Sequence, residues 1–299
     1  MNKYSKYTFL IYVFCFLLIS CKPDQAKSKP SILETKESSF SVPAIPTQIK
    51  TTSMVSSNSP TIEYKPSIIP GLESAKLEII SPLESIPVED LFQIVSNPFY
   101  NPTKGQDDGH QGVDFSFYQY KDFSSINNHP INSIFPGRIS SVINDRPPYG
   151  NAVIIETNFD LISEKYIDLI QNLNLEDEIQ MHSNLNCPDY LTISNNSSTT
   201  EESLFVLYGH LLNKPQFSIN DEVNQGQLIG NVGSTGMSGN PHLHLETRVG
   251  PSHATFNEMA HYINNATTEE MKNYCLWRVS NFYKLFDPML LFLVSPTKP

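Results

Sequence analysis

Basic residues are in the minority in this chain of 299 residues, which carries 20 lysines and arginines against 31 aspartates and glutamates. The formal net charge of −11 argues against a nucleic-acid-binding protein, because such proteins need an excess of basic side chains to neutralise phosphates. Long hydrophobic runs are also absent. The longest, Phe9–Ile19, is too short for a helix to cross the hydrocarbon core of a bilayer, which is about 30 Å thick.

This short hydrophobic run has the flanks of a secretory signal peptide. Lys3 and Lys6 precede it, and its length suits the apolar core of such a signal. It ends in the sequence LISC, which resembles a bacterial lipobox, where the cysteine becomes the lipidated first residue of the mature protein. We therefore expect residues 1–20 to be a lipoprotein signal peptide and Cys21 to carry the lipid. An ordinary signal peptide that contains a cysteine is the alternative.

Cysteine is rare as well, with four residues and no C-x-x-C pair or cysteine-rich zinc motif. Cys15 would leave with the signal peptide, and Cys21 would carry lipid. Cys187 and Cys275 then remain in a chain that is exported to an oxidising compartment. The sequence predicts a single disulfide between them, and two buried free thiols are the alternative.

Residues 21–87 have the composition of a flexible linker. They are rich in Ser, Thr, Pro and Lys, and such segments bury too little apolar surface to offset the entropy lost on ordering. A flexible segment of this length has an end-to-end distance of about 45 Å. The lipid would hold the protein at a membrane of the cell envelope, facing the periplasm or on the cell surface, and the linker would let the domain work away from that membrane. A passive spacer is the alternative, and part of residues 73–80 could already pack on the domain.

The folded domain is expected at residues 88–299. Short segments rich in β-branched and aromatic residues alternate there with turn residues, which predicts a mostly β, antiparallel domain. The expected strands are residues 137–144, 151–157, 203–211, 226–233 and 242–249.

Two longer segments, residues 158–200 and 251–285, interrupt these strands and are expected to be helical insertions. Apolar residues from Ile162 to Leu173 recur at helical spacing in the first insertion. Thr267 and Glu270 have the spacing of a helix capping box in the second. Each insertion contains one of the two remaining cysteines, so the predicted disulfide would tie the insertions together.

Histidines gather near the end of the β-rich region, where His210, His242 and His244 lie within 35 residues of one another. Side chains alternate between the two faces of a strand, so His242 and His244 point the same way. This pair suits a metal site or a paired acid–base arrangement.

A second group of alternating residues lies upstream, in the sequence GHQGVDF. His110, Gly112 and Asp114 share one face if the segment is extended. Gly112 leaves the space between the imidazole and the carboxylate unfilled, so both side chains could bind one metal ion.

The chemistry of catalytic zinc requires such a set of residues. It takes three nitrogen or oxygen ligands and keeps a fourth position for water, whose pKa it lowers to about 7. Acyl transfer also needs a group that moves a proton and a donor for the developing oxyanion. Two histidines and one aspartate would serve as ligands, and two histidines would remain for the other tasks.

Four blocks of the sequence, in this order, resemble the LytM/lysostaphin-type zinc peptidases, which cleave peptide stems and crossbridges of bacterial peptidoglycan. The blocks are GHQGVDF, YGNAVIIE, YGHL and GQLIGNVGSTGMSGNPHLHLETR. The resemblance covers residues 93–157, 203–250 and the closing FDPMLLF (286–292), and it implies an antiparallel β-sheet peptidase domain with one Zn²⁺ ion. The H-x-G-x-D motif of the family implies that His110 and Asp114 bind the metal, and its H-x-H motif implies His244 as the third ligand. His210 and His242 would be the catalytic residues.

The resemblance thus implies a zinc metalloendopeptidase that hydrolyses peptidoglycan peptides. The insertions depart from the family, which usually joins VIIE to YGHL by a short turn; they could flank the groove or bind a cell-wall protein partner. Two other functions stay open: a non-catalytic lipoprotein that binds the cell wall and activates another hydrolase, and a protease with a protein substrate.

The remaining histidines have simpler interpretations. We expect His129 in a surface turn, and His182, His253 and His261 at the surface of the insertions. Tyr208 could belong to the core or contact the substrate.

Overall fold

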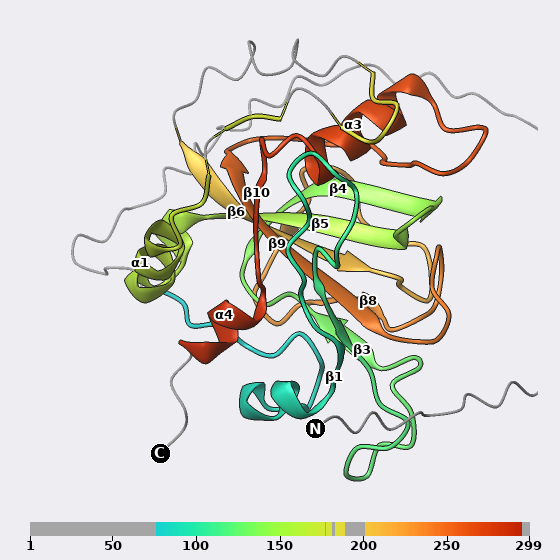
Figure 1. Cartoon of the computed structure of the whole chain (residues 1–299). Coiled ribbons are helices and arrows are strands. Elements are labelled where there is room, and N and C mark those ends of the chain that lie inside the picture. The colour runs from blue at the N-terminus through green and yellow to red at the C-terminus, as the bar shows by residue number, and fades with distance from the viewer. Residues whose placement is uncertain (1–75, 177, 181–182, 189–200, 295–299) are drawn as a thin grey trace, which may run out of the picture. The chain divides into compact units, whose positions relative to one another are not determined.

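The structure is a computed structural model that describes residues 76–176, 178–180, 183–188 and 201–294 (Figure 1). The expected signal peptide, Cys21 and most of the expected linker lie outside these residues. Within the described ranges, no helix combines the length and hydrophobicity that a membrane crossing requires.

Most of the strands form one antiparallel sheet. Its strands lie in the order β1-β2-β9-β6-β5-β4-β7, and β10 pairs with β9. They are β1 (Val95–Asn97), β2 (Val113–Phe115), β4 (Gly137–Arg146), β5 (Gly150–Asn158), β6 (Glu202–Gly209), β7 (Glu222–Val223), β9 (Leu243–Pro251) and β10 (Lys284–Phe286). A second, two-stranded sheet pairs β3 (Pro130–Asn132) with β8 (Leu228–Asn231).

The central strands are buried on both faces of the large sheet. In β5, Val153 and Ile155 face the main core, whereas Ala152 and Ile154 face a second, smaller core on the other side. Strand β6 alternates in the same way. A strand that is covered on both faces has no polar side. This is why the apolar residues AVII follow one another without interruption in the segment NAVIIE.

The first insertion contains η2 (Phe159–Leu161) and α1 (Glu164–Asn172). Tyr166 and Ile170, four residues apart, are the buried residues of α1 and pack into the main core. The two short helices η1 (Val88–Gln93) and α4 (Met289–Leu293) also contribute to this core.

The second insertion contains α3 (Thr268–Arg278), which packs on the opposite face of the sheet. The expected capping box is present, because the Thr267 side chain accepts a hydrogen bond from the Glu270 backbone and the Glu270 carboxylate accepts one from the Thr267 backbone. Trp277 packs edge-on against Phe205 of β6, with ring centroids 6.5 Å apart. Figure 1 shows α3 beside the β4–β5 part of the sheet, away from α1.

A disulfide joins Cys187 of the first insertion to Cys275 of α3, the pair that the sequence predicts. Cys275 is fully buried in the second core, and Cys187 packs against that core from outside. With both insertions present as helical segments on an antiparallel sheet, the expected fold class is confirmed.

The folded domain begins before residue 88: the sequence allowed for packing by residues 73–80, and the packed part extends beyond them. Ile79, Leu83 and Ile86 fall within the predicted linker, yet they are buried in the main core. Leu83 and Ile86 are separated from each other and from Ile80 by polar and proline residues, so the local composition hides their role in packing. Residues 76–87 therefore belong to the domain.

His129 is not in a surface turn, contrary to the expectation from the sequence. It is only 6% exposed, and its Nε2 lies 2.8 Å from the Glu84 carbonyl oxygen. Its ring packs edge-on against Phe123, with centroids 4.9 Å apart. The polar sequence around His129 predicted a surface turn, but the carbonyl group of Glu84 satisfies the imidazole and allows burial.

The structure also shows where Tyr208, His253 and His261 lie. Tyr208 belongs to the core, where its buried hydroxyl accepts a hydrogen bond from the Ile134 N–H at 3.0 Å. His253 is exposed as expected. His261 is half-buried and stacks on Tyr274 instead of lying free at the surface, and His182 lies outside the described residues.

Candidate metal centre

The antiparallel register of β2 and β9 brings the two histidine motifs together. Asp114 of β2 pairs directly with His244 of β9. Val113 and Phe115, the neighbours of Asp114, are buried in the main core, so Asp114 points to the opposite face, where α3 also packs. His110 lies just before β2. His110 and Asp114 therefore lie on the same side of the chain, as the alternation of side chains along a strand predicted.

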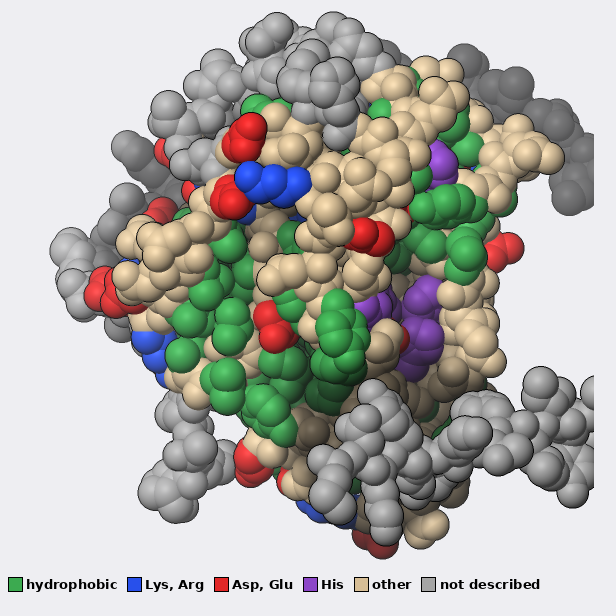
Figure 2. Space-filling view, in the orientation of Figure 1, with side chains coloured by type: hydrophobic (Ala, Val, Ile, Leu, Met, Phe, Trp, Pro, Cys, Tyr) green, Lys and Arg blue, Asp and Glu red, His purple; other side chains and the backbone are tan. Residues whose placement is uncertain are grey.

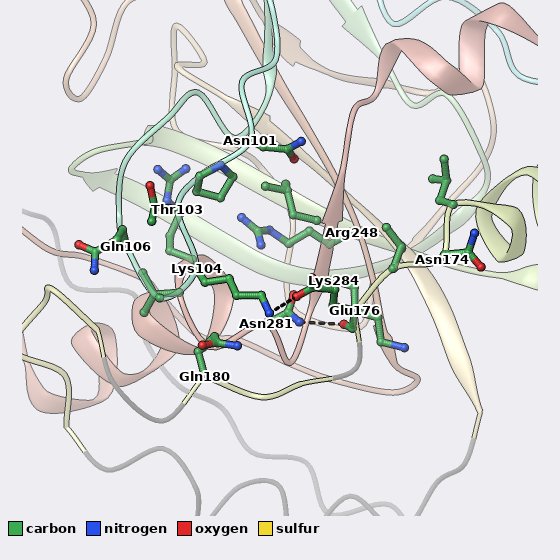
Figure 3. Close-up of a pocket in the computed structure, with 17 residues that line it drawn as sticks. Asn101, Thr103, Lys104, Gln106, Asn174, Glu176, Gln180, Arg248, Asn281 and Lys284 are labelled. Atoms are coloured by element: carbon green, nitrogen blue, oxygen red, sulfur yellow. Dashed lines mark hydrogen bonds and ion pairs between the residues drawn. The ribbon is translucent and has the colours of Figure 1, made fainter.

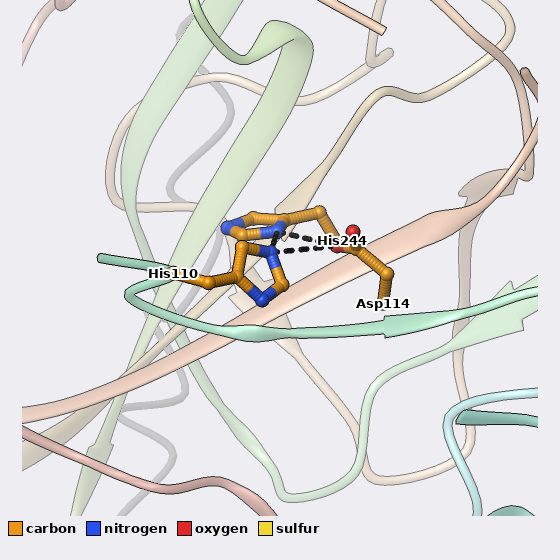
Figure 4. A group of neighbouring side chains, drawn as sticks. All are labelled: His110, Asp114 and His244. Carbon is orange, nitrogen blue, oxygen red and sulfur yellow. Dashed lines mark hydrogen bonds and ion pairs between the residues drawn. The ribbon is translucent and has the colours of Figure 1, made fainter. Parts of the chain in front are cut away.

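Three potential ligand atoms converge at this point (Figure 4). His110 Nε2 lies 3.1 Å from Asp114 Oδ1, and His244 Nδ1 lies 2.8 Å from the same oxygen. The two ring nitrogens are 3.2 Å apart. Each of the three residues offers a ligand atom within 4.8 Å of the others.

The two other predicted histidines flank this cluster. The rings of His210 and His242 have centroids 4.6 Å apart, and His242 Nε2 lies 3.5 Å from Asp114 Oδ1. His210 follows β6 and has a φ of +58°, a conformation that few non-glycine residues adopt and that sets the direction of its ring. All five predicted site residues thus lie together, although their sequence positions span more than 130 residues.

Backbone carbonyl groups fix the tautomer of three of the four imidazoles. Each Nδ1 lies 2.8 Å from a carbonyl oxygen, in the pairs His110–Pro98, His210–Thr235 and His242–Asn240. A carbonyl oxygen can only accept, so Nδ1 carries the hydrogen and Nε2 keeps its lone pair when the ring is neutral. The free lone pair of His110 therefore belongs to the nitrogen that lies beside Asp114.

His244 has the reverse arrangement. Its Nε2 lies 3.1 Å from Glu246 Oε1, and Nδ1 is the nitrogen in the cluster. Glu246 is fully buried on the same face of β9. A carboxylate behind a ligating imidazole fixes the orientation of the ring and makes it a stronger ligand.

The electrostatics of the site favour an ionised Asp114 and a neutral His210. Burial opposes ionisation of Asp114, but its contacts with the imidazoles of His110 and His244 outweigh burial and hold the pKa of the carboxyl well below its usual range. Burial, together with the charges of His244 and His242, lowers the pKa of His210 to about 3. His210 therefore carries no charge at neutral pH.

The three ligand atoms fit a zinc-sized transition metal. Two imidazole nitrogens and one carboxylate oxygen are a ligand set that catalytic zinc sites use, and tetrahedral ligands about 2.0–2.1 Å from an ion lie about 3.3 Å from one another. The distances of 2.8–3.2 Å between these atoms are close to that value. Side chains of His110 and His242 are 17% and 12% exposed, and histidine side chains are visible at the surface in Figure 2.

Glycines let the chain pass close to the site. A Cβ atom on Gly112 would lie 2.7 Å from His244 Cε1 and 2.6 Å from the Leu245 carbonyl oxygen. The space that the sequence left open between His110 and Asp114 is therefore where the His244 ring lies. Gly236, in the loop before the H-x-H pair, has a φ of +73° and passes too close to Gly150 for any side chain.

The prediction from sequence did not include Glu246 or the residues that surround it. Glu246 has the parity of His242 and His244, so the pattern H-x-H-x-E could have indicated it. Its partners Trp277 and Arg278 lie on α3. Asp107, which binds Arg278, lies before the first motif. No local sequence pattern marks these three residues.

A separate polar pocket of about 370 Å³ lies next to these partners (Figure 3). Its walls come from residues 101–106, from both insertions, and from Arg248 and Arg278. Lys104 Nζ lies 2.6 Å from Glu176 Oε2, which links the loop before the first motif to the first insertion. None of the five predicted site residues lines this pocket.

Comparison with protein families gives a match to Peptidase family M23 over residues 192–257. The match confirms the resemblance to the LytM/lysostaphin-type peptidases. The matched segment includes His210, His242 and His244, three of the predicted site residues, whereas His110 and Asp114 lie before it. A comparison with curated proteins gave no match.

Solved structures of two peptidases and of one M23 protein are also similar to this chain. A zinc-containing peptidase from Vibrio cholerae is 18% identical with a TM-score of 0.32, over 57% of this chain and only 37% of the other. The catalytic domain of the antimicrobial peptidase lysostaphin from Staphylococcus simulans is 20% identical with a TM-score of 0.33, over 69% and 97%. A mutant catalytic domain of the prophage-encoded M23 protein EnpA from Enterococcus faecalis is 20% identical with a TM-score of 0.31, over 54% and 85%.

Proposed function

We propose that this protein is a zinc-dependent endopeptidase that hydrolyses peptide stems or crosslinks of bacterial peptidoglycan. The observation that carries the proposal is the meeting of five side chains at one place: a His-Asp-His cluster of metal ligands and two further imidazoles beside it. The match to Peptidase family M23 supports the same class of reaction.

His110 Nε2, Asp114 Oδ1 and His244 Nδ1 would hold one Zn²⁺ ion. Bound zinc supplies a Lewis acid for the scissile carbonyl and lowers the pKa of water. Two of the ligands are already oriented without the metal, because the Pro98 carbonyl group holds the ring of His110 and Glu246 holds the ring of His244.

His210 and His242 would be the groups that accept and donate a proton during peptide hydrolysis. Each has its Nδ1–H engaged by a backbone carbonyl, so each can accept a proton only at Nε2. The low pKa of His210 means that its Nε2 is unprotonated at neutral pH and can accept a hydrogen bond, although the same low pKa makes this ring a weak base. Once protonated, either ring can return the proton to a leaving amine or donate a hydrogen bond to an oxyanion.

Zinc binding at pH 7 is expected to release about one proton. Burial lowers the pKa of His244, but its hydrogen bonds to Asp114 and Glu246 outweigh burial and raise the pKa to about 9. The metal-free protein therefore holds a proton on His244 at pH 7, and zinc must displace it from Nδ1. Apparent affinity should rise about tenfold per pH unit between pH 7 and 9 and then level off. Calorimetric titration in buffers of different ionisation enthalpy measures the proton count, and a heat that is independent of the buffer would contradict the prediction.

Gly112→Ala is expected to weaken zinc binding and to destabilise the domain by about 1–3 kcal/mol, the usual effect of overpacking. The added methyl group would overlap the His244 ring and the Leu245 carbonyl oxygen. Gly239→Ala is the matched control, because nothing lies within 4 Å of its Cβ position. Zinc titration and denaturant unfolding check both variants; equal behaviour of the two would show that the close contact at Gly112 is not needed.

The activity itself can be tested on purified peptidoglycan. The zinc-loaded protein is incubated with it, with and without a chelator, and the released fragments are identified by mass. We expect peptide-bond cleavage that the chelator abolishes and added zinc restores. Fragments that appear only when another hydrolase is present would favour the non-catalytic activator, and cleavage of proteins but not of peptidoglycan would favour a protease with a protein substrate.

We also propose that the protein is held at a membrane of the cell envelope by a lipid on Cys21. The lipobox-like end of the hydrophobic run supports this proposal. Cys21→Ser should block processing or release the protein from membranes; a variant that matures normally and still fractionates with membranes would refute the anchor.

A further inference from the structure

The second insertion contacts the metal site through one buried carboxylate. Helix α3 packs on the face of the sheet that carries His244 and Glu246. Trp277 Nε1 donates to Glu246 Oε2 at 2.8 Å, and Arg278 Nη1 lies 3.1 Å from Glu246 Oε1. Glu246 Oε1 is the same oxygen that binds His244 Nε2.

Glu246 depends on these partners because it is completely buried. A buried carboxylate is costly unless cations and hydrogen-bond donors compensate for the water that it loses. Arg248 supplies one cation, with Nη2 3.3 Å from Oε2, and the Tyr149 hydroxyl donates to Oε1 at 2.7 Å. The second cation and the indole donor come from α3. With both oxygens held from several directions, the carboxylate cannot rotate away from His244.

Arg278 also binds the segment that precedes the other histidine ligand. Its Nε lies 2.7 Å from Asp107 Oδ1, and the Asp107 side chain is only 2% exposed. Asp107 lies three residues before His110. One guanidinium group thus bridges two carboxylates, one beside His110 in the chain and one in contact with His244. The fixed fork of arginine suits such a bridge, whereas the single ammonium group of lysine does not.

We propose that Trp277 and Arg278 are positioning residues of the metal site: they fix Glu246, and through it the imidazole of His244, so that the second insertion stabilises the arrangement of ligands. This inference rests on the proposed metal site of His110, Asp114 and His244. It gives the second insertion a role in metal binding in addition to covering the sheet.

The alternative is that the two side chains only stabilise α3. Zinc affinity distinguishes the two roles. Arg278→Met removes the bridge, and Trp277→Phe removes the N–H donor with the five-membered ring and keeps a smaller aromatic ring in the second core. Leu276→Ala is the matched control: it truncates a buried residue of the same helix and core whose apolar side chain can donate no hydrogen bond to Glu246.

The experiment measures the zinc dissociation constant of each full-length variant by competition with a chelator, together with thermal unfolding of the metal-free protein. We expect the dissociation constant to rise about 10–100-fold for Arg278→Met and about 10-fold for Trp277→Phe, as found for outer partners of metal ligands. Leu276→Ala should lower the unfolding temperature but leave zinc affinity nearly unchanged. The absorption spectrum of the Co²⁺-substituted protein should change in the first two variants only, because it reports ligand geometry.

The inference is overturned if Arg278→Met and Trp277→Phe bind zinc as tightly as the unmodified protein, or lose no more affinity than Leu276→Ala. If Arg278→Met does not fold, Trp277→Phe decides alone. If only Arg278→Met weakens binding, the role of Trp277 is refuted and that of Arg278 stands. An unmodified protein that takes up no zinc would instead refute the proposed metal site, and the inference with it.

Discussion

Alanine at His110, Asp114 or His244 is expected to remove zinc and peptidase activity together, whereas replacement of His210 or His242 should leave most of the zinc bound and slow turnover about 10²–10⁴-fold. The reason is the arrangement of the ring nitrogens. The three ligand atoms lie within 4.8 Å of one another, and catalytic zinc needs only three protein ligands because its fourth position must stay open.

The variant at position 210 should be His210→Asn. The residue has a positive φ, which asparagine tolerates and alanine does not, so the change removes the imidazole without adding backbone strain. His253→Asn is the matched control, since His253 is exposed and also has a positive φ. It should retain full activity.

Metal content and the rate of peptide release from crosslinked peptidoglycan fragments are measured for every variant. The proposed division of roles is wrong if His242→Ala loses zinc as completely as His244→Ala. It is also wrong if His210→Asn keeps full turnover, because His210 would then take no part in proton transfer.

Removal of the disulfide is the other change with a large expected effect. Replacing both Cys187 and Cys275 by Ala should lower the free energy of unfolding by about 2–5 kcal/mol. The disulfide closes a loop with a sequence separation of 88 residues, so without it the unfolded chain gains considerable conformational entropy. Alanine is chosen because position 275 is buried among apolar side chains and a serine hydroxyl would lack a partner there.

Denaturant unfolding with and without reductant provides the measurement. Reductant should shift the unmodified protein towards the variant and leave the variant unchanged. Equal stability of the two proteins under oxidising conditions would contradict the expectation, and peptide mapping that finds both thiols free would explain it.

Much of the fold could be predicted because it depends on local patterns. Apolar and β-branched residues bounded by turn residues indicated β4, β5 and β6 nearly at their observed bounds, and the Thr267–Glu270 spacing marked the start of α3. The boundary of the domain could be predicted only in part. Leu83 and Ile86 lie among polar and proline residues outside every predicted helix or strand, and only the core that they pack into shows why they are ordered.

The clustering of the five candidate site residues was predictable in part, for a related reason. Parity along a strand is a local property, and it places His242 with His244, and His110 with Asp114. Their meeting depends on the pairing of β2 with β9, which local patterns do not contain and which the family resemblance implied. The burial of His129 was missed because its carbonyl partner at Glu84 is distant in sequence.

The sequence by itself thus determined which residue types could serve the chemistry and on which face of a strand each would lie. The tertiary structure alone decided how those side chains are held. The nitrogen that each imidazole presents depends on the carbonyl or carboxylate behind it, and two of the partners of Glu246 come from a helix about thirty residues further along the chain. Hydrogen bonds of this kind depend on distance in space, and the packing of α3 against the sheet sets that distance.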